Sequence, residues 1–426
     1  MKKLALLICL VLCVSFISTA ALAEEKTVLK YMTLSSGQGW EAEQKMLELF
    51  EQAYPDIQVE TTVVSGVPDF VTVLGTKFAS GEAPDVFSFQ GGSRTFEYAS
   101  AGKLLDLSGQ EFMNRFYEND LKLVQYQQGV YAMPLNVEMT GLFINTDALK
   151  QYGDFEAPTC FPELVTLLDQ LVAAGCKAPL VCAGKDIGNV AQVDFQYLAT
   201  VLWYNQPDYY LDMLQGKRTL NGDESIKDLF AKYATLRNYM SEDALGVDNE
   251  EAKKRFIRGD GVVWIAHGSN VAPIRDMVGE EFNFVVVPSV LQDKPEDRVL
   301  NAGVCMCMHI TAESKNQEAA LKLLEFYARP EVNEIYVTLG KQSSPLRDTT
   351  TLPDRAWAPC YEFAAANPEK RIGHADLVWI AGIKDVMKEV TQKWFLGENL
   401  QSCLDYWQAQ HEKLLADNPK FVDEYI

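Results

Sequence analysis

Strand-like and helix-like patterns alternate along the N-terminal part of the chain. Runs rich in β-branched and aromatic residues, which favour strands, lie at 27–34, 57–64 and 86–89. Between them, 42–53 and 70–80 carry apolar residues at helical spacing. Gly81 is suited to end the second helix because glycine readily adopts a positive φ. This β-α-β-α-β order predicts a parallel sheet with right-handed crossovers.

The rest of the chain predicts a helical middle between two further α/β segments. From about 158 to 254 the pattern is mostly helical, and 304–310 (VCMCMHI) is typical of a buried strand. Ser314 and Gln317 have capping-box spacing and predict a helix that starts at Ser314. Other strands are expected at 262–266 and 284–287. We therefore expect an α/β protein with two lobes joined by crossing segments, rather than consecutive domains.

The stretch GEAPDVFSFQGGS, at 81–93, suggests where a ligand binds. Its apolar run is typical of a strand buried on both faces, and the residues after it are polar or glycine. In open α/β sheets, ligands bind outside the carboxyl ends of the strands. We expect the polar side chains that follow the predicted strands to face a ligand.

The first 23 residues have the pattern of a cleavable signal peptide. Lys2 and Lys3 precede an apolar run, and Ala21-Leu22-Ala23 is a typical cleavage site. No cysteine stands where a lipoprotein signal needs one. We expect an exported protein, either periplasmic or at the cell surface, without a lipid anchor.

Composition excludes some partners. The 426 residues carry a formal net charge of −21, which argues against nucleic acid or an anionic membrane. Of nine cysteines, Cys9 and Cys13 leave with the signal peptide, so an odd number remains. A chain of this length does not need disulfides for its core, and we expect no disulfide framework.

Five motifs occur in a characteristic order. They are EQAYPDIQVE at 51–60, ASGEAPDVF at 79–87, YAMPLNVEMTGLFINTDAL at 131–149, RFIRGDGVVWIAHGSN at 255–270 and ITAESKNQEAALKLLEFYARPEVNEIY at 310–336. Together they resemble the family 1 extracellular solute-binding proteins of ABC importers, the group that includes maltose-binding protein. The resemblance extends from about 27 to 397. One departure is Asn270, where the family usually has a tryptophan, so a sugar-stacking ring is missing there or comes from another residue.

The resemblance implies a two-lobed periplasmic-binding-protein fold of type II. Each lobe would be a mostly parallel sheet flanked by helices, with hinge strands between the lobes. Lobe one would comprise 24–133 plus 309–328, and lobe two 134–305 plus 329–426. A sugar (mono- or oligosaccharide) or a related polyol would bind between them, with ABC transporter permease subunits as partners. The resemblance implies a monomer without a cofactor.

A sugar site needs polar side chains for hydroxyls and aromatic rings for C–H faces. Loops after the predicted strands and at the first lobe crossing supply this mixture, and the resemblance adds one aromatic from the C-terminal helices. The candidate ligand-binding residues are Gln38, Trp40, Gln90, Ser93, Arg94, Asn136, Glu138, His267, Ser269, Asn270 and Trp379.

Several of these candidates have an alternative structural role. Trp40 can serve as a hydrophobic staple of its helix, and Gln90 can cap the helix that follows. Asn136 and Glu138 can satisfy backbone groups at the hinge. Trp379 lies in a mostly apolar stretch and can pack in the core.

Metal binding and catalysis are the remaining alternatives. Cys305, Cys307 and His309 would share one face of a strand and suit copper(I), but methionine and cysteine also fill cores, so we expect no metal site.

A secreted glycoside hydrolase would need two carboxyl groups about 5–10 Å apart, and 59 acidic residues supply such pairs by chance. Because motifs of serine hydrolases, zinc proteases and P-loop proteins are missing, we expect a binding protein, not an enzyme. A non-sugar polar solute is the other ligand class.

Overall fold

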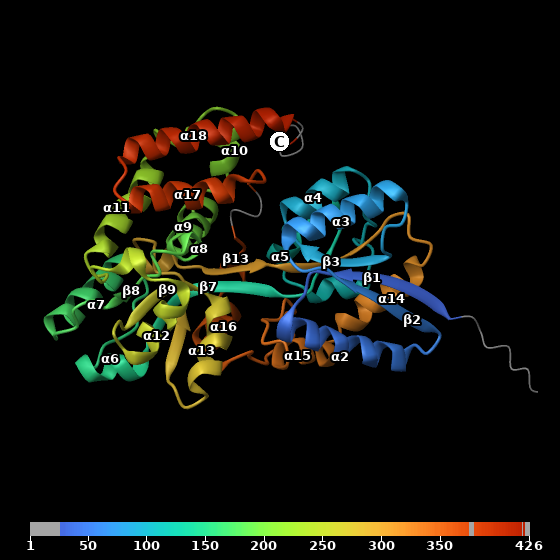
Figure 1. The fold of residues 1–426 in the computed structure, drawn as a ribbon, viewed down its shortest axis with the longest axis horizontal. Coiled ribbons are helices and arrows are strands. Elements are labelled where there is room, and N and C mark those ends of the chain that lie inside the picture. The colour runs from blue at the N-terminus through green and yellow to red at the C-terminus, as the bar shows by residue number, and fades with distance from the viewer. Residues whose placement is uncertain (1–25, 375–378, 420, 422–426) are drawn as a thin grey trace, which may run out of the picture.

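Two β-sheets, each covered by helices on both faces, form two lobes that lie side by side (Figure 1). The computed structural model describes residues 26–374, 379–419 and 421. The expected signal peptide, 1–23, lies outside the described residues. None of the described helices is both long and apolar enough to cross a membrane.

The sheet of the first lobe confirms the β-α-β-α-β unit. Its strand order is β2-β1-β3-β12-β6. β1 (Thr27–Thr33) pairs in parallel with β2 (Ile57–Val63) and with β3 (Val86–Gln90). A strand from much later in the chain, β12 (Met306–Ile310), lies antiparallel between β3 and β6 (Met133–Pro134).

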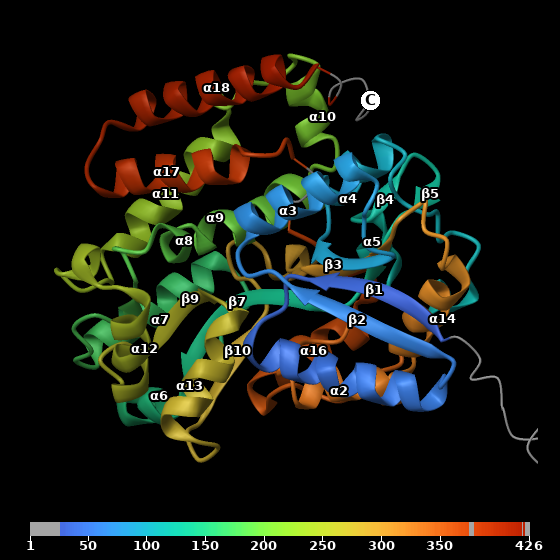
Figure 2. The ribbon, with the colours of Figure 1, turned by 45° about the vertical axis from the view of Figure 1, so that its right-hand side comes forward.

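Helices cover both faces of this first sheet (Figure 2). On one face Phe70 stacks on Phe89, with ring centroids 4.6 Å apart, and on the other Phe50 packs against Phe326. Gly81 ends the second helix with φ 72°, as predicted. The helices are α3 (Val67–Ser80) and α4 (Ser93–Ser100) on the first face, and α2 (Gly37–Ala53), α14 (Gln317–Tyr327) and α15 (Pro330–Thr338) on the second. The shorter elements are η1 (Glu111–Arg115), α5 (Glu118–Lys122), β4 (Gln125–Tyr126) and β5 (Gly129–Val130).

Asp85, just before β3, ties three segments of the first lobe together. Its buried carboxylate accepts hydrogen bonds from the Lys30 backbone N–H (2.8 Å), the Ser314 hydroxyl (2.6 Å) and the Asn316 amide (3.2 Å). The predicted capping box is therefore wrong. Ser314 is engaged by Asp85, and the helix begins only at Gln317.

The sheet of the second lobe is mixed. Its order is β13-β11-β7-β9-β8, with β10 also paired to β7. The expectation of a mostly parallel sheet is wrong here, because β7 carries the chain into this lobe and runs antiparallel to β9, β10 and β11. The strands are β7 (Val137–Asn145), β8 (Leu180–Val181), β9 (Val263–His267), β10 (Phe284–Val287), β11 (Leu300–Val304) and β13 (Arg371–Ile372).

Two helical layers enclose the second sheet around the buried rings of Trp264 and Trp407. The larger layer contains α6 (Thr146–Tyr152), α7 (Phe161–Ala173), α8 (Ile187–Val190), α9 (Gln192–Tyr197), the π-helix η2 (Leu198–Tyr204), α10 (Tyr209–Leu214), α11 (Glu224–Arg237), α17 (Ile383–Phe395) and α18 (Leu400–Asp417). The smaller layer contains α12 (Asn249–Arg258), α13 (Val271–Val278) and α16 (Ala358–Ala366). The 3₁₀ turns are η3 (Ala244–Gly246), η4 (Gly268–Asn270), η5 (Pro295–Asp297), η6 (Arg355–Trp357) and η7 (Pro368–Lys370).

Three chain segments pass between the lobes next to one another. The first joins β6 to β7 through Leu135 and Asn136, and the second joins β11 to β12 at Cys305. Near Ser343 a third segment runs alongside the first, and the Ser343 carbonyl accepts a hydrogen bond from the Val137 N–H at 3.0 Å. Extended segments of this kind can absorb the dihedral changes of a hinge.

Helix α15 packs with the first lobe. Its residues Val332 and Tyr336 lie in the same core cluster as Leu29 and Phe50. This packing does not fit the expected return to lobe two at 329. We propose that the first lobe continues through α15 and that the third crossing lies near Ser343.

A buried ion pair links the lobes beside these crossings. Asp120 of α5 and Arg371 of β13 are in direct contact, with side chains only 1% and 5% exposed. Asn119 donates a hydrogen bond to the Arg371 carbonyl at 3.0 Å, and the guanidinium group lies over the Tyr117 ring. Burial raises the pKa of Asp120, and the charge of Arg371 opposes that rise.

Replacement of Arg371 by methionine should strongly destabilise the protein. It leaves Asp120 buried without its cation, a defect that costs about 3–5 kcal/mol of unfolding free energy. The double variant Asp120→Leu/Arg371→Met removes both charges and should recover most of that loss. Urea-induced unfolding followed by circular dichroism measures both values. Equal losses in the single and double variants would contradict this account.

Candidate ligand site between the lobes

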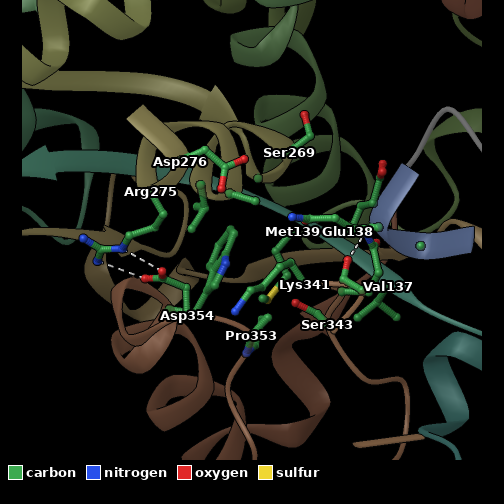
Figure 3. Close-up of a pocket in the computed structure, with 18 of the residues that line it drawn as sticks. Val137, Glu138, Met139, Ser269, Arg275, Asp276, Lys341, Ser343, Pro353 and Asp354 are labelled. Carbon is green, nitrogen blue, oxygen red and sulfur yellow. Dashed lines mark hydrogen bonds and ion pairs between the residues drawn. The ribbon is translucent and has the colours of Figure 1, made fainter. Parts of the chain in front are cut away.

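Two cavities lie between the lobes, and Glu138 of β7 lines both. The Ser269 cavity, of about 250 Å³, is shown in Figure 3. Its walls include Gln38, Lys341, Ser269, Arg275, Asp276 and Trp357. The Arg94 cavity, of about 510 Å³, has walls that include Gln90, Ser93, Arg94, Gln192, Phe195 and Lys384. Because each wall combines residues of both lobes, a change in the angle between the lobes would change both cavities.

A chain of hydrogen bonds fixes the polar centre between these cavities. His267 Nε2 lies 3.0 Å from Glu138 Oε2, and His267 Nδ1 lies 2.8 Å from the Ser269 hydroxyl. The Ser269 backbone N–H also donates to Nδ1, at 3.2 Å. This network assigns the Nε2–H tautomer to a neutral His267, with Nδ1 as the acceptor.

Glu138 is ionised over the ordinary pH range. Burial by itself raises the pKa of its carboxyl group, but His267, with a smaller contribution from His374, lowers that pKa to about 2. The side chain is 35% exposed, so a bound molecule can reach it. An ionised carboxylate accepts hydrogen bonds only, and hydroxyl groups are suitable donors for it.

The structure brings most of the predicted site residues to these two cavities. Gln38 and Ser269 line the Ser269 cavity, and Glu138 lines both. The candidates on the wall of the Arg94 cavity are Gln90, Ser93, Arg94 and His267. Arg94 also pairs with Glu97 across 3.1 Å, an exposed contact of low energy that leaves the guanidinium group available to a ligand.

Comparison with known proteins agrees with this geometry. The family model for bacterial extracellular solute-binding proteins matches residues 35–334. The chain belongs to this family. A multiple sugar-binding protein from Streptococcus mutans is 31% identical over 146 residues, which span 33% of either chain. A probable sugar-binding periplasmic protein from Brucella melitensis is 24% identical and matches 78% of this chain and 79% of its own.

Solved structures show the same fold. The ligand-free form of RafE from Streptococcus pneumoniae has a TM-score of 0.80 with 19% identity, over 92% of this chain and 98% of RafE. RafE in complex with raffinose has a TM-score of 0.73 over 91% of this chain and 100% of RafE. These likenesses establish the two-domain architecture of the family for this solute-binding protein.

Two predicted contacts of this solute-binding protein are structural instead. Asn136 is buried at the first crossing, where its amide donates to Gln342 at 2.6 Å and its carbonyl accepts from the Met306 N–H at 2.8 Å. Asn270 is also buried and accepts a hydrogen bond from the Asn249 amide at 3.0 Å. Both side chains have their partners within the protein, and neither lines a cavity.

Neither predicted tryptophan lies on a cavity wall. The placement of Trp379 in the cleft is wrong, because its ring is buried in the core of the second lobe and stacks on Tyr210 at 4.6 Å. Trp40 is half-buried against the core of the first lobe. The rings on the walls are Trp357 and Phe195. Trp357 lies against Gly268, next to the position where the family usually has a tryptophan.

Gln192 and Phe195 are cavity residues that the sequence analysis missed. Together with Gly188 they recur at helical spacing and line the Arg94 cavity from α8 and α9. Gln192 is only 5% exposed, and its amide donates to the Gly188 carbonyl at 2.9 Å. Its carbonyl oxygen has no hydrogen-bond partner in the described part of the chain. A buried acceptor without a partner is a candidate ligand contact.

The Cys-Met-Cys-Met-His run forms part of the core. The His309 ring stacks on Phe87 at 4.7 Å, and its Nε2 lies 3.0 Å from the Thr95 hydroxyl. Within 26–374, 379–419 and 421, no three His, Cys, Asp or Glu side chains come together as a metal site. Burial raises the pKa of Cys305 and Cys307 and keeps both thiols protonated.

Substitution of Asn136 by alanine should reduce stability, because it removes the partners of the Met306 N–H and of Gln342. We expect a loss of about 1–3 kcal/mol in the free energy of unfolding, measured by chemical denaturation. Asn238→Ala, at an exposed position, is the control and should stay within about 0.5 kcal/mol of the unmodified protein. An Asn136→Ala protein as stable as this control would contradict the structural role.

Proposed function

We propose that this protein captures a sugar or a related polyol between its lobes and delivers it to the permease subunits of an ABC importer. The observation that carries the proposal is Glu138, an ionised acceptor next to the first crossing that lines two cavities built from both lobes. The names of the sugar-binding relatives from Streptococcus mutans and Brucella melitensis support it. Export as a monomer, to the periplasm or cell surface, belongs to the same proposal.

The cavity walls have the chemistry that a neutral sugar needs. Glu138 and the Gln192 carbonyl accept hydrogen bonds, and Arg94 donates them. Trp357 and Phe195 are largely buried, at 4% and 6% exposed, and only the part of each ring on the cavity wall can meet the C–H faces of a sugar. This combination distinguishes the site from one built for an apolar ligand.

The carboxyl groups argue against glycoside hydrolysis. Such an enzyme needs a general acid whose pKa is raised. In the described part of the chain, the carboxyl groups with a raised pKa are Glu43, Asp120 and Asp194, and none of them lines either cavity. Glu138, with a pKa of about 2, is a poor proton donor at neutral pH. These facts support a protein that leaves its ligand unchanged.

A thermal-shift screen tests the ligand class. Raffinose, stachyose, galactose and chitin oligosaccharides, the ligands of structural neighbours, should be screened beside polyols and amino acids. A sugar that binds should stabilise the protein by about 2.7 kcal/mol when present at 100 times its Kd. A shift with amino acids alone would replace the sugar proposal with another solute. Hydrolysis of an aryl glycoside would support the enzyme alternative.

Substitutions in the cleft test the site. Glu138→Ala and Gln192→Leu should each weaken the binding of the best sugar from that screen by about 1–3 kcal/mol, or roughly 5- to 150-fold. Isothermal titration calorimetry measures the affinity, and exposed Glu398→Ala is the control. If Glu138→Ala binds as tightly as this control, the carboxylate does not contact the sugar.

Binding should also close the lobes. A ligand shifts the open–closed equilibrium by its difference in affinity for the two states. Small-angle scattering should therefore show a smaller radius of gyration with saturating sugar. Identical curves, with binding confirmed by calorimetry, would indicate a rigid cleft.

A further inference from the structure

Glu43 of α2 is a fully buried carboxyl group with an unusual environment. The Tyr31 hydroxyl donates a hydrogen bond to its Oε2 at 2.7 Å, and the Ser35 hydroxyl donates to its Oε1. No lysine, arginine or histidine of the described chain forms an ion pair with it. A buried carboxylate held only by hydroxyl groups is costly, so such a group is a candidate for a functional role.

This carboxyl group holds the loop that lines the Ser269 cavity. Ser35 and Ser36 end the connection from β1, and Gly37, Gln38 and Gly39 form the first turn of α2; this segment is called the loop 35–39 below. Ser36, Gln38 and Gly39 form part of the cavity wall. Ser36 occupies the N-cap position of α2 but makes no capping hydrogen bond with its side chain. The contact with Glu43 is therefore a principal side-chain tether of this loop.

Each helix or strand that packs against Glu43 contributes a tyrosine as its titratable neighbour. The tyrosines are Tyr31 on β1, Tyr327 on α14 and Tyr336 on α15, and burial raises the pKa of all three. Tyr327 donates a hydrogen bond to the backbone carbonyl of Glu43 at 3.3 Å. Since all three tyrosines are neutral, none compensates a negative charge on the carboxyl group.

Tyr336 extends this network towards the cleft. A Cβ atom on Gly39 would lie 3.7 Å from the Tyr336 hydroxyl, so this side chain packs under the loop. Burial and the charge of Glu43 raise the pKa of Tyr336, and a side-chain hydrogen bond with Ser35 opposes that rise. Tyr336 is thus a further contact of the segment that Glu43 holds.

We propose that Glu43 is a proton-linked positioning residue for the loop 35–39. As a carboxylate it accepts both hydroxyl hydrogen bonds and keeps the loop in place. After it takes up a proton, the new O–H must donate, so Ser35 or Tyr31 has to reverse its hydrogen bond and accept from Glu43, which weakens the tether and shifts the loop. The effect on sugar affinity rests on the proposed function: through Glu43, sugar binding at that site depends on pH.

Glu43 gains and loses its proton in the neutral pH range. Burial raises the pKa of Glu43 to about 7, against the opposing effect of the hydrogen bonds from Ser35, Tyr31 and Thr33. The unfolded chain has the ordinary value of 4.5. The folded protein thus favours the protonated form of Glu43 more than the unfolded chain does. The resulting contribution to the free energy of unfolding is fully present below pH 4.5 and is lost as the pH rises through 7.

Proton titration followed by NMR tests the proposal without any sugar. In the unmodified protein, the amide signals of Gly37 and Gly39 should shift between pH 5.5 and 8.5 with a midpoint near 7. Glu43→Gln, which imitates the neutral acid, should abolish this titration. Glu48→Gln, on the exposed side of the same helix, should retain it. Loop signals that do not titrate, or that titrate unchanged in Glu43→Gln, would overturn the proposal.

Two further measurements separate positioning from a merely structural role. A ¹³C titration of the Glu43 carboxyl carbon in the unmodified protein gives its pKa even if the variant fails to fold. The affinity for the best sugar of the screen should fall about tenfold from pH 8 to pH 6, because the weakened tether shifts the cavity wall, and should not depend on pH in Glu43→Gln. If no sugar binds but the loop titrates, only the proposed function fails. A loop that titrates without any change in affinity would contradict the regulation of binding.

Discussion

The hydrogen bonds among the three crossing segments constrain every other feature of the molecule. Asn136 lies where these segments meet, with one side-chain atom bonded to the second crossing and another to the third. The Leu135 N–H also donates to the Met306 carbonyl, and the Val137 N–H donates to that of Ser343. A hinge must bend without leaving such groups without hydrogen-bond partners, because each unpaired buried polar group reduces the free energy of unfolding by about 1–3 kcal/mol. The closure proposed above therefore requires the three crossings to move together.

This constraint also places the polar centre of the cleft. Glu138 follows Asn136 by two residues, on the strand that enters the second lobe, so it stays at the junction whatever the angle between the lobes. His267 is the last residue of the neighbouring strand β9, and Ser269 lies in the turn that follows it. The pairing of β9 with β7 sets His267 opposite Thr140.

The sequence allows local order to be predicted better than the direction of side chains. The β-α-β-α-β unit and the glycine at the end of α3 depend on neighbours in the chain, and the structure confirms them. Glu138 reaches the cavities as expected, whereas Asn136, two residues before it, does not. Periodicity could not separate them, because the partners of Asn136 lie about 170 and 206 residues away. The burial of Trp379 likewise depends on Tyr210, from a distant helix.

Two carboxyl groups of this protein show how environment assigns different roles to one chemical group. Glu138 lies beside His267 and is partly exposed, so it stays ionised, with a pKa of about 2. Glu43 has only hydroxyl partners and no contact with solvent, so its pKa is about 7. The first offers a constant charge to a bound molecule, whereas the second changes charge in the neutral range.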